Sequence, residues 1–293
     1  MAKLPSSWPA SVSIVEVGPR DGLQNEARLW SLCEKQQLVE KLLGCGLKTI
    51  EVGAFVHPDR VPQMANSDAL IAALRETLPE NDFSKLSALV PNKRGLDRAL
   101  ASGIKKIAIF TAADDAFNHA NIGMTVSESL ELYKPVVKSA LSHGLLVRGY
   151  ISAAFVTPQD RRRVAPKKLS DVTQALITMG VHEVSIGDTT GNAVASQVEE
   201  TLSELLIKVP ANTLAMHFHD TDGFALANTV IALQAGITTF DSSVGGLGGC
   251  PYAPGAAGNL ATEKLITMLD RMSIKTAVNT KLVDQVAHWV KSM

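Results

Sequence analysis

The sequence contains little cysteine. Cys33, Cys45 and Cys250 are the three cysteines among 293 residues, an odd number with irregular spacing. Small secreted domains that depend on disulfides carry an even and much denser set, so this composition excludes a disulfide scaffold. It is typical of proteins that fold in a reducing compartment, and we therefore expect a cytoplasmic location.

The chain also lacks an excess of either charge and any long apolar run. Its 28 basic and 29 acidic side chains give a formal net charge of −1, which offers no general attraction to nucleic acid or anionic lipid. No apolar stretch reaches the roughly 18 residues of a membrane-spanning helix. The opening MAKLPSSWPASVS has neither the apolar core of a secretion signal nor the arginines of a transit peptide. We expect a small-molecule partner, with no nucleic acid and no membrane.

What the chain does contain is an alternation of short β-branched runs with longer amphipathic segments. Glu34–Leu43, for example, has apolar residues at helical spacing and is followed by glycines. Eight strand–helix units in a chain of this length favour a closed TIM (β/α)8 barrel of the α/β class. We predict a single domain over residues 1–293, with a C-terminal helix (about 274–293) packed outside. The predicted strands are Ile14–Gly18, Thr49–Gly53, Leu86–Val90, Ile107–Thr111, Val147–Ala154, Glu183–Gly187, Leu214–Phe218 and Thr239–Val244.

Ionisable and amide side chains gather at the ends of five predicted strands. In a (β/α)8 barrel, the active site is built at the carboxyl ends of the strands. A polar group buried there needs a partner or an ion, because burial without one is costly. The gathering therefore indicates an enzyme. The side chains are Arg20 and Asp21 (first strand), Glu51 (second), Asp188 (sixth), His217 and His219 (seventh), and Asn259 and Glu263 (after the eighth).

His217 and His219 form the sharpest pattern. Side chains two apart on a strand point to the same face, so both imidazoles can reach one metal ion. The alternative is two core histidines satisfied by carbonyl groups, but the strand-end position favours a metal. Asp21 would add an anionic oxygen and Asn259 a neutral one. Two nitrogens and two oxygens without a thiolate suit Mg²⁺ or Mn²⁺, with Co²⁺ as a third candidate, better than structural zinc.

Three of the charged residues would support the site without being clear metal ligands. Arg20 is either half of a surface ion pair, which would contribute little, or a planar donor aimed at a developing oxyanion. Glu51 would hold Arg20 in place, and Asp188 would orient the site without binding the metal.

The glycine-rich stretch Gly245–Asn259 surrounds Cys250 and has three interpretations. It is a phosphate cradle, a flexible connection with an inert thiol, or a lid that presents a reactive thiol to the substrate. The first is weak, because the stretch does not follow the first strand of a nucleotide-binding unit. We assign no binding site for an organic cofactor.

With these motifs in view, the sequence resembles the 3-hydroxy-3-methylglutaryl-CoA lyases, within a wider group of barrel enzymes that includes isopropylmalate and homocitrate synthases. The matching runs span nearly the whole predicted barrel, and the last is the most specific to the lyases. They are IVEVGPRDGLQNE (14–26), VPQM (61–64), VRGYIS (147–152), HFHDTDGFALANT (217–229) and SSVGGLGGCPYAPGAAGNLATE (242–263).

The resemblance implies a metal-dependent lyase that cleaves a carbon–carbon bond of an acyl-CoA thioester, giving acetyl-CoA and acetoacetate. It implies that Arg20 stabilises an enolate and that Cys250, on the lid, takes part in proton transfer. It also implies a homodimer, with leucine degradation as the usual setting of the family. Glu51 and Glu263 match supporting positions. The implied ligands of the divalent cation are Asp21, His217, His219 and Asn259.

Two questions stay open at this point. The base that removes the first proton is either His217 or a carboxylate such as Asp21. The acyl group is also open, because the stretch Ser152–Asp160 replaces a cysteine-containing element of the family and is followed by the charge run Arg161–Arg163. The alternatives are the same chemistry on citramalyl-CoA or a longer branched hydroxyacyl-CoA, and a non-catalytic barrel that binds metal or CoA esters.

Overall fold

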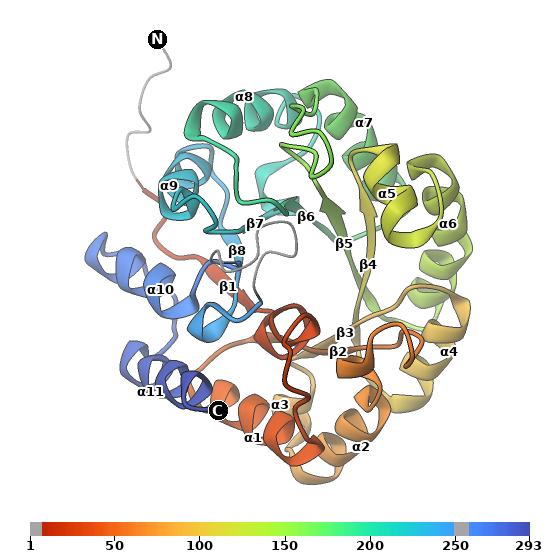
Figure 1. Ribbon diagram of the computed structural model, residues 1–293, viewed down its shortest axis with the longest axis vertical. Helices are drawn as coiled ribbons and strands as arrows, with labels where there is room; N and C mark the ends of the chain where they lie inside the picture. Colours follow the sequence, from red (N-terminus) through yellow and green to blue (C-terminus); the bar gives the residue numbers. More distant parts are fainter. Residues whose placement is uncertain (1–7, 249–257) are drawn as a thin grey trace.

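Eight parallel strands close into a barrel. The structure is a computed structural model, and it describes residues 8–248 and 258–293. Each strand pairs with the next along the chain and β8 pairs with β1, so the sheet has no free edge, as Figure 1 shows. The predicted TIM barrel is confirmed. The strands are β1 (Ser13–Glu16), β2 (Thr49–Ala54), β3 (Leu86–Leu89), β4 (Lys106–Ala112), β5 (Leu146–Ser152), β6 (Glu183–Asp188), β7 (Leu214–Phe218) and β8 (Thr239–Ser242).

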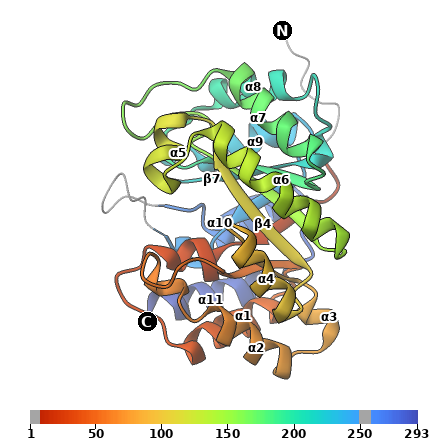
Figure 2. The ribbon, with the colours of Figure 1, turned by 90° about the vertical axis from the view of Figure 1, so that its right-hand side faces the viewer.

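Helices surround the barrel, as Figures 1 and 2 show. They are α1 (Leu32–Gly44), α2 (Ser67–Thr77), α3 (Glu80–Phe83), α4 (Lys93–Ser102), α5 (Asp115–Ile122), α6 (Val126–Ser142), α7 (Pro166–Thr178), α8 (Ala195–Leu205), α9 (Ala225–Gln234), α10 (Thr262–Arg271) and α11 (Thr280–Lys291). Within the described ranges, no helix combines the length and the apolar character needed to cross a membrane.

The C-terminal helix packs beside the first helix of the barrel. Helix α1 starts at a capping box, in which Ser31 Oγ accepts from the Glu34 backbone N–H (3.3 Å) and the Glu34 carboxylate accepts from the Ser31 N–H (2.7 Å). The expected C-terminal helix is α11, which lies outside the barrel beside α1. Trp289 on α11 packs edge-on against Trp30, with ring centroids 5.8 Å apart. The C-terminal helix is thereby tied to the α1 side of the barrel.

Glycine follows several of the helices that lead into strands. Gly103 closes α4 with φ of 80°, and its N–H donates to the Leu100 carbonyl (3.2 Å). A β-carbon at this position would lie 1.9 Å from a guanidinium nitrogen of Arg75. Both the left-handed conformation and the lack of space therefore favour glycine here.

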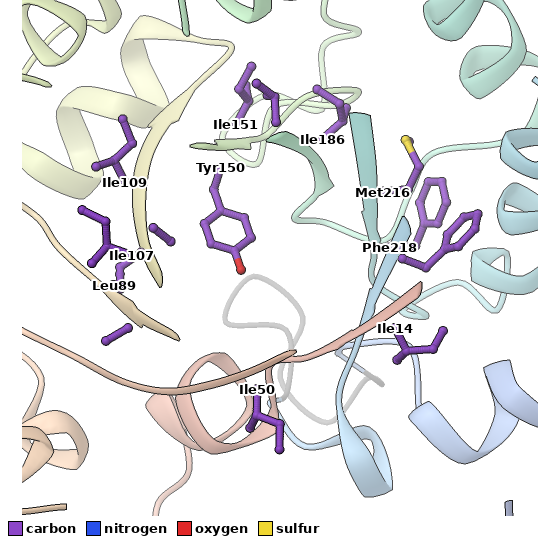
Figure 3. Close-up of a cluster of buried hydrophobic side chains, with 14 of the residues drawn as sticks. Ile14, Ile50, Leu89, Ile107, Ile109, Tyr150, Ile151, Ile186, Met216 and Phe218 are labelled. Atoms are coloured by element: carbon purple, nitrogen blue, oxygen red, sulfur yellow. The ribbon is translucent and has the colours of Figure 1, made fainter. Parts of the chain in front are cut away.

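The outer face of the strands is aliphatic, whereas the lumen of the barrel is polar. Figure 3 shows Ile50 and Met216 on the outer side of their strands and Tyr150 pointing into the lumen. Alternation along β5 places Arg148 on the same face as Tyr150 and Ile151 on the opposite face. Barrels of this type usually fill the lumen with bulky branched side chains. Charged groups in that place must be paired, and they indicate a functional role.

Candidate metal centre and active site

Asp21, His217 and His219 meet at the carboxyl end of the barrel. One ligand atom from each lies within 4.8 Å of the others, and the two imidazole centroids are 5.3 Å apart. His217 Nε2 lies 3.9 Å from Asp21 Oδ2. When several donor atoms bind the same ion, each at about 2.1 Å, neighbouring donor atoms lie roughly 3–4 Å from one another. The spacing therefore suits three groups arranged around a common ion.

The chain segment that carries Asp21 is a single π-helical turn, Gly18–Gly22, which follows β1. It packs tightly against the segment after β8, because a β-carbon on Gly22 would lie 2.6 Å from Ser243 Oγ and 2.8 Å from Leu247 Cβ. The two histidines come from β7 and the residue after its end. Three separate segments thus position the cluster, and glycine permits their close approach.

Asn259 lies beside this cluster because the chain returns from β8 to the end of β7. Its backbone pairs antiparallel with that of His219. Its side-chain amide nitrogen donates to Asp21 Oδ2 (2.9 Å) and to the Leu247 carbonyl (3.1 Å). A β-carbon on Gly248 would lie 2.8 Å from this nitrogen, so glycine makes room for the amide. These two hydrogen bonds from the nitrogen fix the orientation of the amide. The amide oxygen is therefore left for another partner.

The donor set fits a divalent cation. His219 Nδ1 and Asn259 Oδ1 are buried, and neither has a hydrogen-bond partner among the described residues. Buried polar atoms nearly always have a partner, so two such atoms beside a carboxylate call for an explanation. With Asp21 and His217 they supply two nitrogens and two oxygens, which suits a divalent ion with octahedral preference.

Burial and neighbouring charges keep two of these groups, Asp21 and His219, in metal-binding protonation states. Burial would raise the pKa of Asp21, but the charges of Arg20, His217 and His219 hold it well below its usual range. Burial, together with the nearby His217 charge, lowers the pKa of His219 to about 4. At neutral pH, Asp21 is therefore ionised and His219 is neutral, which are the forms that bind metal ions.

Arg20 is buried between two carboxylates rather than paired at the surface. It is 6% exposed, its Nε donates to Glu51, and one terminal nitrogen donates to Asp21 Oδ1 at 2.5 Å. Tyr150 donates its hydroxyl to the other oxygen of Glu51 (3.1 Å), and its ring lies under the guanidinium at 5.4 Å. The structure thus brings Glu51 and Arg20 together next to the metal cluster. The interpretation of Arg20 as a surface ion pair is wrong.

A second charged group, which the sequence patterns did not single out, crosses the lumen below the cluster. Asp241 of β8 accepts from Arg148 of β5 (2.6 Å) and from His217 Nδ1 (3.2 Å). Arg148 also pairs with Glu183 (2.9 Å) and donates to the Tyr150 hydroxyl (3.2 Å). Charged residues inside otherwise apolar strands were the available signal, but the sequence does not say which of them pair across a barrel.

The remaining predicted residues lie around this centre. Glu263, in the first turn of α10, accepts from the Gly245 backbone N–H (2.9 Å) and holds the segment after β8. Asp188 ends β6 and accepts from the Ala193 N–H (3.1 Å), so its described contacts order its own loop and not the metal cluster. Cys250 lies outside the described residues.

The charge run after β5 makes surface ion pairs. Arg162 pairs with Asp114 (3.1 Å) and Asp160 (3.2 Å), and Arg163 pairs with Glu200 (2.5 Å). Exposed pairs of this kind contribute little to stability. The run lies at the surface, and two of its three arginines, Arg162 and Arg163, are paired with acidic neighbours.

Glu16 joins the segments that carry the site. The carboxylate is fully buried and accepts from the backbone N–H groups of Gly18 (2.8 Å) and Val244 (2.9 Å) and from Thr262 Oγ1 (2.7 Å). Burial raises its pKa to about 7, against the lowering effect of these hydrogen bonds. One buried carboxyl group therefore links the Asp21 turn, the segment after β8 and the start of α10.

Replacing Glu16 with glutamine is expected to flatten the pH dependence of the unfolding free energy. The pKa is about 7 in the folded chain, against an ordinary glutamate pKa of 4.5. The contribution of Glu16 is thus fully present below pH 4.5 and is lost as the pH rises through 7. Between about pH 5.5 and pH 8, the loss is at most ~2 kcal/mol. Urea unfolding at both pH values measures it, and equal slopes for the two proteins would contradict this account.

Comparison with known proteins shows which family the chain matches. The HMGL-like family profile matches residues 11–290. A hydroxymethylglutaryl-CoA lyase of Bacillus subtilis is 44% identical over 284 residues, covering 97% of this chain and 93% of that protein. A 3-hydroxy-3-isohexenylglutaryl-CoA/hydroxymethylglutaryl-CoA lyase of Pseudomonas aeruginosa is 45% identical over 271 residues, covering 92% and 89%.

Solved structures show the same architecture. The crystal structure of the Bacillus subtilis HMG-CoA lyase matches with a TM-score of 0.93 at 42% identity, covering 97% of this chain and 94% of that one. An HMG-CoA lyase from Acinetobacter baumannii, in complex with coenzyme A and 3-methylmalate, matches with a TM-score of 0.90 at 28% identity, covering 98% and 92%.

Proposed function

The chain belongs to the hydroxymethylglutaryl-CoA lyase family, and from this premise we propose that it cleaves 3-hydroxy-3-methylglutaryl-CoA to acetyl-CoA and acetoacetate. It is a carbon–carbon lyase that depends on a divalent metal. The observation that carries the proposal is the meeting of Asp21, His217 and His219 within 4.8 Å at the open end of the barrel, with Arg20 bound to the same carboxylate.

Four side chains would hold the cation: Asp21, His217, His219 and Asn259. Their donor set favours Mg²⁺ or Mn²⁺, with Co²⁺ as a third candidate. When bound, the cation supplies Lewis acidity that makes the tertiary hydroxyl of the substrate easier to deprotonate and offsets negative charge on its oxygens.

The chain's own residues would then move the protons. A base, either His217 or Asp21, takes the hydroxyl proton. The bond between the α- and β-carbons of the acyl group breaks, its electron pair forms the thioester enolate, and the β-carbon becomes the ketone of acetoacetate. Cys250 gives its thiol proton to the α-carbon, which completes acetyl-CoA, and the proton held by the base restores the thiol.

Arg20 would stabilise the enolate. Glu51 and Asp21 engage its Nε and one terminal nitrogen, and the other terminal nitrogen is available to donate to the enolate oxygen. Because the two carboxylates hold the guanidinium in place before the substrate arrives, little reorganisation is required when charge develops. Glu51 acts in this scheme by orienting Arg20.

A second substrate is favoured by one observation. The Pseudomonas aeruginosa relative, at 45% identity, is named for a longer branched acyl group as well. In this chain, the end of β5 runs into two alanines, Ala153 and Ala154, where the family carries a cysteine-containing stretch. The alternative function is therefore the same cleavage of a longer branched hydroxyacyl-CoA or of citramalyl-CoA. A non-catalytic barrel that binds CoA esters or metal is the least favoured reading.

A panel of thioesters tests the proposal. With Mg²⁺ or Mn²⁺ present, release of acetyl-CoA is followed in a coupled assay for 3-hydroxy-3-methylglutaryl-CoA, a longer branched analogue and citramalyl-CoA. We expect the highest kcat/KM with the first. Preference for another thioester would reassign the substrate, and metal binding without release from any of them would support a binding protein.

Further proposals rest on the resemblance. We propose that the chain acts as a single-domain subunit of a homodimer, that it works in the cytoplasm, and that leucine degradation is its setting.

A further inference from the structure

Asp241 lies at the centre of a buried network formed by four strands. Its side chain on β8 is fully buried. It accepts hydrogen bonds from Arg148 of β5 (2.6 Å), Ser185 of β6 (2.8 Å) and His217 of β7 (3.2 Å). A carboxylate with three donors, one of them a cation, has its lone pairs well satisfied, and such a group holds its neighbours in fixed positions.

The two nitrogens of His217 face different carboxylates. Nδ1 lies 3.2 Å from Asp241 Oδ2, whereas Nε2 lies 3.9 Å from Asp21 Oδ2, on the side of the metal cluster. An ionised carboxylate can only accept a hydrogen bond, so Nδ1 must carry the hydrogen. In the neutral imidazole, Nε2 then has the free lone pair and directs it toward the cluster.

Asp241 is held from the other side of the lumen. A terminal nitrogen of Arg148 lies 2.6 Å from Asp241 Oδ1 and places a cation beside the buried carboxylate. Arg148 is itself held by Glu183 (2.9 Å) and lies over the Tyr150 ring at 5.0 Å from its centroid. The guanidinium therefore stays beside Asp241 without competing for His217.

His219 provides an internal contrast. Its Nδ1, a candidate metal donor, is buried without a hydrogen-bond partner among the described residues, and no described carboxylate accepts a hydrogen bond from its other ring nitrogen. Of the two histidines in the cluster, His217 is the one that the described protein orients. A group that fixes the tautomer and ring angle of a ligand raises its affinity for the metal.

We propose that Asp241 is a positioning residue that fixes His217 in the Nδ1–H tautomer and so aims its Nε2 at the metal, with Arg148 holding Asp241 in place. This inference rests on the proposed metal site. It assigns the pair Asp241 and Arg148 inside the barrel a role in metal affinity, in addition to the mutual neutralisation of their buried charges. A purely structural role would instead lower stability and leave the metal affinity of the folded protein unchanged.

Metal titration of Asp241→Asn tests the proposal. Asparagine has the same shape, but its amide can offer an N–H to His217 Nδ1 and so favour the wrong tautomer. We expect the Kd for Mn²⁺, measured without substrate from the free-ion electron paramagnetic resonance signal, to rise about 10- to 100-fold. Circular dichroism checks folding. Asp171→Asn, at an exposed carboxylate paired with Lys167, is the matched control and should keep the wild-type Kd.

A measurement on the wild type covers the case in which Asp241→Asn does not fold. Nitrogen NMR of ¹⁵N-histidine-labelled, metal-free protein at alkaline pH reports the tautomer directly, with the His217 signals assigned by their loss in His217→Gln. A protonated Nδ1 and an unprotonated Nε2 support the proposal, and the reverse pattern overturns it. An unchanged Mn²⁺ Kd in folded Asp241→Asn overturns it as well.

The outcomes separate this inference from the proposed function. If the wild type binds Mn²⁺ but releases acetyl-CoA from no thioester, the proposed function fails, whereas a weakened Mn²⁺ affinity in Asp241→Asn still supports the positioning role. If the wild type is an active lyase and Asp241→Asn binds Mn²⁺ as tightly, the positioning role fails and the proposed function stands.

Discussion

Replacing Arg20 with glutamine should lower kcat for acetyl-CoA release by about 10³-fold, the upper range for loss of one oxyanion-stabilising donor. Arg20 is 6% exposed and bonded to both Glu51 and Asp21, so its donors are in place before charge develops on the enolate. Glutamine retains a short amide donor but has neither the positive charge nor the planar fork. Steady-state kinetics at saturating metal measure the effect, and we expect a smaller change in KM than in kcat.

The same substitution also leaves the buried Glu51 and the partly buried Asp21 without their cation, so a stability control is necessary. Breaking a buried ion pair by removing one partner costs about 3–5 kcal/mol, whereas removing both partners is far less costly. The double variant Arg20→Gln/Glu51→Gln should therefore regain much of the lost unfolding free energy, as measured by urea denaturation. Its kcat should stay as low as that of Arg20→Gln. Recovery of activity together with stability would assign Arg20 a structural role only.

The barrel and the region of its active site could be predicted because their signals are local. Eight strand–helix repeats and the glycines between them depend on neighbouring residues, and polar residues at strand ends point to the mouth of a (β/α)8 barrel. The His217-x-His219 spacing places two imidazoles on one face for the same reason. The first predicted strand, Ile14–Gly18, was too long, because Gly18 begins the π-helical turn that carries Asp21.

The network across the lumen could not be predicted, because it depends on pairing at a distance. Arg148 and Asp241 come from β5 and β8, which are not adjacent in the sheet. Any inward-pointing charge in another strand was an equal candidate in the sequence. Asp188 shows that a residue can occupy a strand end without a described contact to the metal cluster. Its place at the end of β6 suggested an orienting group for the site, yet its carboxylate accepts from the backbone of the loop that follows.

Exchanging Asp21 for asparagine should weaken Mn²⁺ binding by at least about 100-fold, which is the upper limit for losing a group that only hydrogen-bonds a ligand. Asp21 is the one carboxylate in the described cluster with His217 and His219, so the change removes the negative charge that attracts the ion. An asparagine amide there also offers a donor to the Asn259 amide nitrogen, which now donates to Asp21 Oδ2 at 2.9 Å. Activity should fall with metal occupancy, as chelation of the wild type should also show.

The double variant Asp21→Asn/Asn259→Asp tests whether positions 21 and 259 face the same ion. It moves the carboxylate across a single 2.9 Å hydrogen bond while keeping the charge and atom types of the cluster. If the four side chains surround one ion, the exchange should restore part of the Mn²⁺ affinity measured by titration. It should not restore kcat, because Arg20 would no longer have the ionised partner that now holds one of its terminal nitrogens at 2.5 Å. Equal loss of affinity in the single and exchanged variants would mean that position 259 does not face the ion.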